Sequence, residues 1–140
     1  MKNIFRILVI CLVLCSCESI DEPNYKKVSF EKFNLQIDSA SLANEVWVND
    51  PILVVLKFME DISFSKDRNI ELKVLSIGEV ANDVSIKLSD NGLMDDSVES
   101  EQRLFRLKKT KNVWHIISFG KCWKCQSGRG SSTYDTILCN

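Results

Sequence analysis

The chain has 140 residues, enough for one domain and too few for two ordinary ones. Apolar residues make up 45% and charged residues 26%, a globular balance that argues against a disordered, collagenous or multi-span membrane protein. The formal net charge is -1, and charges of both signs are mixed along the chain, so no basic surface predicts nucleic-acid binding.

The N-terminus has the organisation of a secretory signal. Lys2 and Arg6 precede an unbroken apolar run at residues 7–15. As a helix this run covers about 14 Å, far less than the roughly 30 Å of a bilayer core. We therefore expect residues 1–16 to be a signal peptide that is removed from the mature protein.

The end of this segment reads Leu14-Cys15-Ser16-Cys17, with an aliphatic residue three positions before a cysteine and a small residue just before it. This order resembles the lipobox of bacterial lipoproteins. The resemblance implies cleavage before Cys17 and acylation of its thiol by palmitate-type chains, which anchor a protein stably in a membrane. Residues 17–26 would be the lipidated cysteine and a tether. The alternative is an ordinary cleaved signal with incidental cysteines.

The residue after the cysteine bears on the membrane that receives the anchor. In enterobacterial lipoproteins, retention at the inner membrane usually relies on Asp at this position, and this chain has Glu18. We therefore expect a cell-envelope protein anchored in the outer membrane, on its periplasmic face or at the cell surface.

Residues 27–140 are expected to form a single α+β domain. The triplet Asn49-Asp50-Pro51 offers a capping side chain before a proline at the first helical position, and apolar residues follow at helical spacing through 62. The β-branched run at 52–55 fits a buried strand equally well, so the sequence leaves residues 51–62 open between helix and strand.

The second half of the domain alternates with the period of a strand. Strands are predicted around 70–74, 84–88, 101–109 and 113–119, with turns at 90–92 and 109–112. One further strand near the start is suggested by Val28, Phe30, Leu35 and Ile37. We therefore expect an antiparallel sheet of four to five strands with one helix packed on one face.

Near the C-terminus, a strand carrying Trp114 leads into Cys125-Gln126-Ser127-Gly128-Arg129-Gly130, and Cys139 closes the region. Together with Asp95-Asp96-Ser97-Val98, this pattern over residues 93–139 resembles the ends of small exported bacterial proteins of uncharacterised function. The resemblance implies a cystatin-like or nuclear-transport-factor-like architecture and a disulfide between Cys125 and Cys139. A loop of ~15 residues closed in this way is stabilised by about 3 kcal/mol.

Cys122 departs from the resembled pattern and is left as an odd thiol. It can be free, pair between chains, or exchange with Cys125. The spacing Cys122-Trp123-Lys124-Cys125 also permits thiol-redox chemistry, but thioredoxin-like sites open a helix after a strand, and this one follows an antiparallel strand.

The same cysteines raise the possibility of zinc. With Cys139 and His115 they would supply the three thiolates and one imidazole that tetrahedral zinc accepts, but the second half of the set lacks a matching pair and oxidation competes. His115 is the only histidine, and we expect it to be structural because no nucleophile elbow accompanies it.

Two further motifs can be interpreted either as ordinary structure or as ligand-binding sites. Gly128-Arg129-Gly130 offers backbone N–H groups and a guanidinium to an anion or a partner, but a flexible turn inside a disulfide loop is the favoured interpretation. The acids of residues 90–101 invite a calcium reading, but Gly92, Met94 and Val98 stand where a calcium loop needs oxygen donors. We interpret this stretch as a solvated acidic turn.

No convergent acid–base or nucleophile set is present, which favours a non-catalytic lipoprotein with a small binding domain and no cofactor. Its expected partners are the membrane, through the lipid anchor, and a protein, with no nucleic acid. A surface immunity protein or hydrolase inhibitor that uses the Arg129 loop as a plug is one alternative. An envelope thiol-redox or zinc protein that uses Cys122 and Cys125 is the other.

Overall fold

The computed structural model describes residues 23–60, 69–77, 82–91, 93 and 95–140. The predicted signal peptide, Cys17 and most of the tether lie outside these residues. Within them, no helix has the length and apolar character needed to cross a bilayer.

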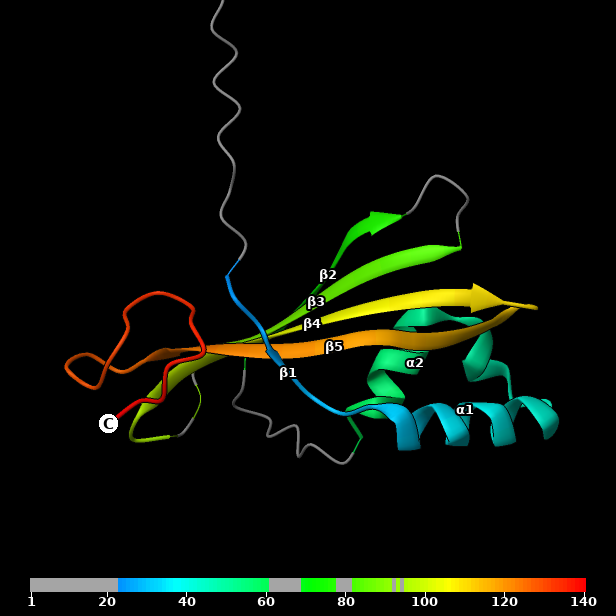
Figure 1. The fold of residues 1–140 in the computed structure, drawn as a ribbon, viewed down its shortest axis with the longest axis horizontal. Coiled ribbons are helices and arrows are strands. Elements are labelled where there is room, and N and C mark those ends of the chain that lie inside the picture. The colour runs from blue at the N-terminus through cyan, green and yellow to red at the C-terminus, as the bar shows by residue number, and fades with distance from the viewer. Residues whose placement is uncertain (1–22, 61–68, 78–81, 92, 94) are drawn as a thin grey trace, which may run out of the picture.

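The described residues form one antiparallel sheet of five strands with two α-helices on one face (Figure 1). The helices are α1 (Glu31–Leu42) and α2 (Pro51–Phe58), with a short 3₁₀ helix at Val46–Asn49 between them. The strands are β1 (Lys26–Lys27), β2 (Asn69–Ile77), β3 (Asp83–Asn91), β4 (Val98–Thr110) and β5 (Val113–Cys125). Their spatial order is β1-β5-β4-β3-β2, so a four-stranded meander is completed at one edge by β1. The predicted α+β class is confirmed, with two helices in place of the one expected.

Helix α2 begins where the capping signal predicts. The Asp50 carboxylate accepts hydrogen bonds from the backbone N–H groups of Ile52 and Leu53, at 2.8 and 3.2 Å, and Pro51 occupies the first helical turn. Val54 and Val55 are fully buried against the sheet. The cap and the proline therefore decide for a helix over the strand that the β-branched run also allowed.

The prediction of a strand near the start of the domain is wrong for most of its length. Only Lys26–Lys27 forms a strand, and Leu35 and Ile37 lie in α1. The alternation of four apolar residues was misleading because Leu35 is exposed, and the buried residues of this helix, Ile37 and Ala40, are three apart. Helical spacing therefore decides which side chains reach the core.

The turn predicted at residues 90–92 is also placed differently. Asp90 and Asn91 lie within β3, and Asp90 is fully buried; Gly92 is outside the described residues. The next predicted turn is confirmed in a narrower form. Lys111 and Asn112, both with positive φ, join β4 to β5 in a two-residue hairpin loop.

An aromatic cluster fills the space between the sheet and the helices. Phe105 and Phe119 stack on neighbouring strands with ring centroids 4.5 Å apart. Phe58 of α2 meets both rings edge-on at 5.6 and 5.0 Å, and Phe33 of α1 meets Phe58 at 5.0 Å. These contacts fix both helices on one end of the sheet, which leaves the other end for the C-terminal loop (Figure 1).

The start of the domain is held by a glycine of β5. A Cβ on Gly120 would lie 2.8 Å from the Cβ of Tyr25 and 3.3 Å from the carbonyl oxygen of Lys26, so only glycine lets this segment approach β5 closely. Tyr25 and Lys26, which the sequence assigned to the tether, are thus already part of the fold.

Candidate functional site

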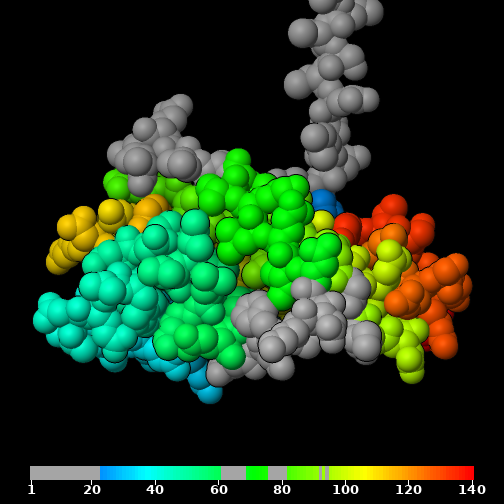
Figure 2. Space-filling model, turned by 180° about the vertical axis from the view of Figure 1, so that it is seen from behind, coloured from blue at the N-terminus to red at the C-terminus, as the bar shows by residue number. Residues whose placement is uncertain are grey.

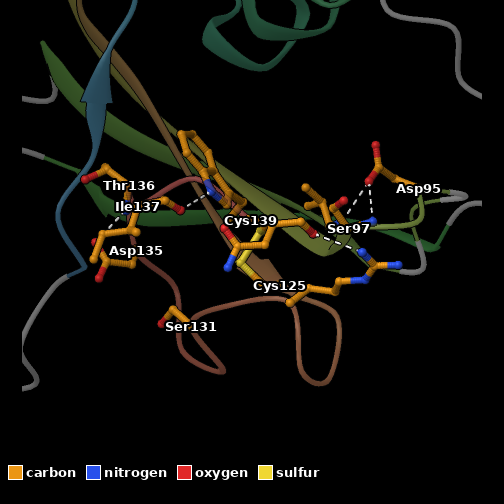
Figure 3. The surroundings of a disulfide bond; sticks show 12 residues. Asp95, Ser97, Cys125, Ser131, Asp135, Thr136, Ile137 and Cys139 are labelled. Atoms are coloured by element: carbon orange, nitrogen blue, oxygen red, sulfur yellow. Dashed lines mark hydrogen bonds between the residues drawn. A yellow bond between two sulfur atoms is a disulfide. The ribbon is translucent and has the colours of Figure 1, made fainter.

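A disulfide closes the C-terminal loop at the end of the sheet that the helices leave uncovered. It joins Cys125, the last residue of β5, to Cys139, with the two Cα atoms 5.6 Å apart (Figure 3). The pairing implied by the sequence resemblance is confirmed. We call residues 126–138 the stapled loop.

Hydrogen bonds hold the stapled loop along the outer edge of β5. Asp135 and Trp123 exchange two backbone hydrogen bonds of 2.9 and 3.0 Å, and the N–H of Cys125 donates to the carbonyl of Ser131 at 2.9 Å. The Trp123 indole N–H donates to the carbonyl of Ile137 at 2.7 Å. The loop therefore extends the sheet, following β1 along the same edge, and does not hang free (Figure 3).

The two glycines beside Arg129 have different structural reasons. Gly128 has a φ of +78° with open space around it, so it serves the turn alone. Gly130 has a φ of +149°, and a Cβ there would lie 2.8 Å from the Cys125 sulfur. The Gly-Arg-Gly segment is therefore shaped by the disulfide against which it packs.

Arg129 is exposed at the tip of the stapled loop, and its backbone is fixed. Its N–H donates to the carbonyl of Gln126 at 2.9 Å, and its carbonyl accepts from the N–H of Asn140 at 2.7 Å. Among the described residues, the guanidinium makes one long contact, 3.4 Å from Nη1 to the main-chain oxygen of Asn140. The remaining donors of this planar cation are available to a carboxylate or phosphate group.

The acidic turn before β4, at residues 95–97, is hydrogen-bonded to the start of the stapled loop. The Asp95 carboxylate accepts hydrogen bonds from the N–H groups of Ser97 and Val98, both at 2.8 Å, and these bonds lower the pKa of Asp95. The carbonyl of Ser97 in turn accepts from the N–H of Gln126 at 2.8 Å. The two halves of the C-terminal sequence pattern thus meet in space, and Asp95 is engaged in its own turn.

Cys122 is a free and fully buried thiol. Burial raises its pKa from 9.0 to about 11, although a hydrogen bond with Tyr25 opposes the rise. Because β5 is a strand through Cys125, residues 122 and 125 point to opposite faces and their Cα atoms are separated by about 10 Å. A disulfide spans no more than about 7 Å, so this Cys-x-x-Cys pair is not arranged for exchange.

His115 lies at the other end of the same strand. Cys122 lies seven positions further along the strand, a distance of about 23 Å, so the imidazole and the thiols do not converge on one metal ion. Its Nε2 contacts the Asp38 carboxylate of α1 at 2.9 Å, a contact that ties this helix to β5. Among the described residues, no group of three or more His, Cys, Asp or Glu side chains is placed to hold a metal.

A charged cluster on β4 and β5 was not predicted from the sequence. Arg103 on β4 is buried and pairs with Glu101 through Nη2 at 2.5 Å, and Lys121 on β5 reaches the same carboxylate at 3.4 Å. One local signal was present: Glu101 and Arg103 continue, toward the start of β4, the alternation that places Phe105 and Leu107 in the core. Within the described part of the chain, Arg103 Nη1 has no hydrogen-bond partner.

No protein-family model, curated protein or solved structure matches this chain.

Proposed function

We propose that this chain is a non-catalytic lipoprotein of a bacterial cell envelope, anchored through Cys17, whose stapled loop binds a protein partner. The observation that carries the proposal is the fixed presentation of Arg129. The disulfide, the strand pairing of Asp135 and the bonds to Gln126 and Asn140 order its backbone before any partner arrives. Preorganisation of this kind lowers the entropy cost of binding.

A short segment would link the domain to the membrane anchor. The fold begins at Tyr25, and the segment 18–24 spans at most about 25 Å when fully extended. The domain would therefore be held close to the bilayer. In the outer membrane this places the stapled loop within reach of other envelope proteins.

The expected partner surface is acidic. The exposed guanidinium of Arg129 is suited to bidentate pairing with a carboxylate, and its flanking glycines leave it sterically accessible. Neither Cys122 nor Cys125 is arranged for thiol chemistry that would compete with this role. Cys125 is held in the disulfide, and Cys122 is a buried, high-pKa thiol.

Site-specific cross-linking in living cells tests this function. A photo-reactive amino acid at exposed Ser127 should give one discrete protein adduct, and the adduct should disappear when Arg129→Glu is added. The same amino acid at Lys111, in the hairpin at the other end of β5, is the matched control and should give none. No adduct at Ser127, or an adduct that is indifferent to Arg129→Glu, would contradict the proposal.

A further inference from the structure

The two edges of the sheet differ in whether the described residues pair with them. The outer edge of β5 is covered by β1 and by the stapled loop. At the other edge, β2 is a strand of nine residues, and no described residue pairs with its outer side. Figure 2 shows β2 at the molecular surface beside the helices. A strand edge of this length that none of the described residues covers is a template for pairing with another strand.

The β2 side chains divide into an apolar and a charged row. Ile70, Leu72 and Val74 pair with β3 residues on the face that the helices cover. Glu71 and Lys73 lie on the opposite face, half exposed, and form an ion pair of 2.9 Å within the strand. A bulge between Val74 and Ser76 interrupts the ladder with β3, which continues with a shifted register to Ile77.

Symmetry limits how two copies of β2 can pair antiparallel. Residues that lie opposite each other in an antiparallel pair point to the same face of the sheet. If the helices of both copies cover the same face, one residue of β2 must therefore lie opposite its own copy, with the two-fold axis between them. An axis at Glu71 places two glutamates opposite each other, and an axis at Lys73 does the same with two lysines. Only an axis at Leu72 pairs Glu71 of each copy with Lys73 of the other.

The register centred on Leu72 is complementary on both faces. Ile70 lies opposite Val74 of the other copy, and the two Leu72 side chains lie opposite each other. The paired segment is 69–75, which spans the start of β2 to the bulge. It provides about six to eight backbone hydrogen bonds.

We propose that the chain forms a homodimer through antiparallel pairing of β2 with β2 of a second copy, centred on Leu72, which joins the two sheets into one. Cross-strand pairs of opposite charge stabilise this register, and like charges directly opposite disfavour it. The inference is independent of the function proposed for the stapled loop.

Charge reversal tests the register. The full chain, purified in a mild detergent, should sediment with the mass of two polypeptides. Glu71→Lys and Lys73→Glu should each reduce it to one polypeptide, because each places like charges opposite each other. The double variant E71K/K73E should restore the dimer, and so should a mixture of the two single variants. Lys108→Glu, exposed on β4 and away from β2, is the control and should remain dimeric.

Cysteine cross-linking tests the same register without charge. Glu71→Cys and Lys73→Cys are exposed and should not cross-link alone, but a mixture of them should form a reducible dimer under oxidising conditions. A wild-type chain that is monomeric would overturn the proposal. It would be overturned in the same way if β2 pairs with a strand of a different protein and not with a second copy. A dimer that all charge variants retain, or no cross-link in the mixture, would overturn it as well.

Discussion

The side-chain amide of Asn34 hydrogen-bonds to both backbone groups of Ile116. Its Nδ2 donates to the Ile116 carbonyl at 2.8 Å, and its Oδ1 accepts from the Ile116 N–H at 3.1 Å. The carboxamide thus occupies the place of a neighbouring strand at this point of the β5 edge, and it attaches α1 to the sheet. Farther along the same edge, β1 and the stapled loop take over this role.

Asn34→Ala should lower the free energy of unfolding by about 1–3 kcal/mol, because it removes two partly buried hydrogen bonds and leaves backbone groups unpaired. Gln36→Ala, on the exposed side of α1, is the matched control and should change stability little. Denaturant unfolding measures both. Equal effects would show that the Asn34 contact is unimportant for stability.

Gly128 and Gly130 form a second matched pair. Both have positive φ, so alanine is strained at either position: by about 1–2 kcal/mol at Gly128, and by about 1–3 kcal/mol at Gly130, whose φ of +149° is essentially restricted to glycine. Only at Gly130 would the new methyl group meet the Cys125 sulfur. Gly130→Ala should therefore destabilise the protein by about 1–3 kcal/mol more than Gly128→Ala and speed reduction of the disulfide by dithiothreitol. A similar loss in both variants would contradict the packing described here.

The Cys122 thiol should make stability fall in alkaline solution. In the unfolded chain it loses its proton above pH 9, whereas in the folded chain burial holds the pKa at about 11. Between these values the unfolded state binds fewer protons, so stability falls as pH rises, by up to about 1.4 kcal/mol per unit. At pH 7–8 the thiol is almost fully protonated in both states, so it contributes almost no pH dependence there.

Cys122→Ala should remove this contribution, so the stability difference between wild type and variant should change between pH 9 and 11 and stay constant between pH 7 and 8. Unfolding curves at each pH provide the measurement. A constant difference across the whole range would mean that the thiol titrates equally in both states.

Glu101→Gln should be strongly destabilising, by about 3 kcal/mol, because it leaves the Arg103 guanidinium buried without its carboxylate. Lys124→Ala breaks the 2.8 Å pair with Glu99, which is more exposed, and should cost less than about 1 kcal/mol. Chemical denaturation of the two variants compares the pairs. A small effect of Glu101→Gln would show that the buried charges are solvated in another way.

The sequence predicted the elements whose signals are local. The period-two alternation located the strands, the Asp50-Pro51 pair located the start of α2, and the cysteine pattern implied the disulfide. Helix α1 was missed because its buried residues, Ile37 and Ala40, are few and its exposed Leu35 imitates an alternation. Asp90 was misplaced because a buried aspartate in a strand has the same local pattern as a turn.

The parts of the candidate site that the sequence could not predict depend on long-range contacts. Nothing near Gly120 indicates that Tyr25 will lie against it, and nothing near Gln126 indicates that Ser97 will accept its hydrogen bond. The odd thiol of Cys122 was visible, but its burial was not. The Tyr25 contact exists because β1 pairs with the outer edge of β5, and the Ser97 contact continues the β4–β5 pairing beyond Val98 and Cys125. Both depend on the topology of the sheet and not on spacing along the chain.

We propose that the cysteines of this chain serve the membrane anchor and the disulfide, and that none of them is catalytic. Mass spectrometry of the mature protein isolated from the envelope is the direct test. We expect an N-terminal peptide that begins at an acylated Cys17, a Cys125–Cys139 linkage, and Cys122 as a free thiol that alkylates only after unfolding. An unmodified N-terminus elsewhere, a Cys122–Cys125 bond, or zinc retained by the native protein would contradict it.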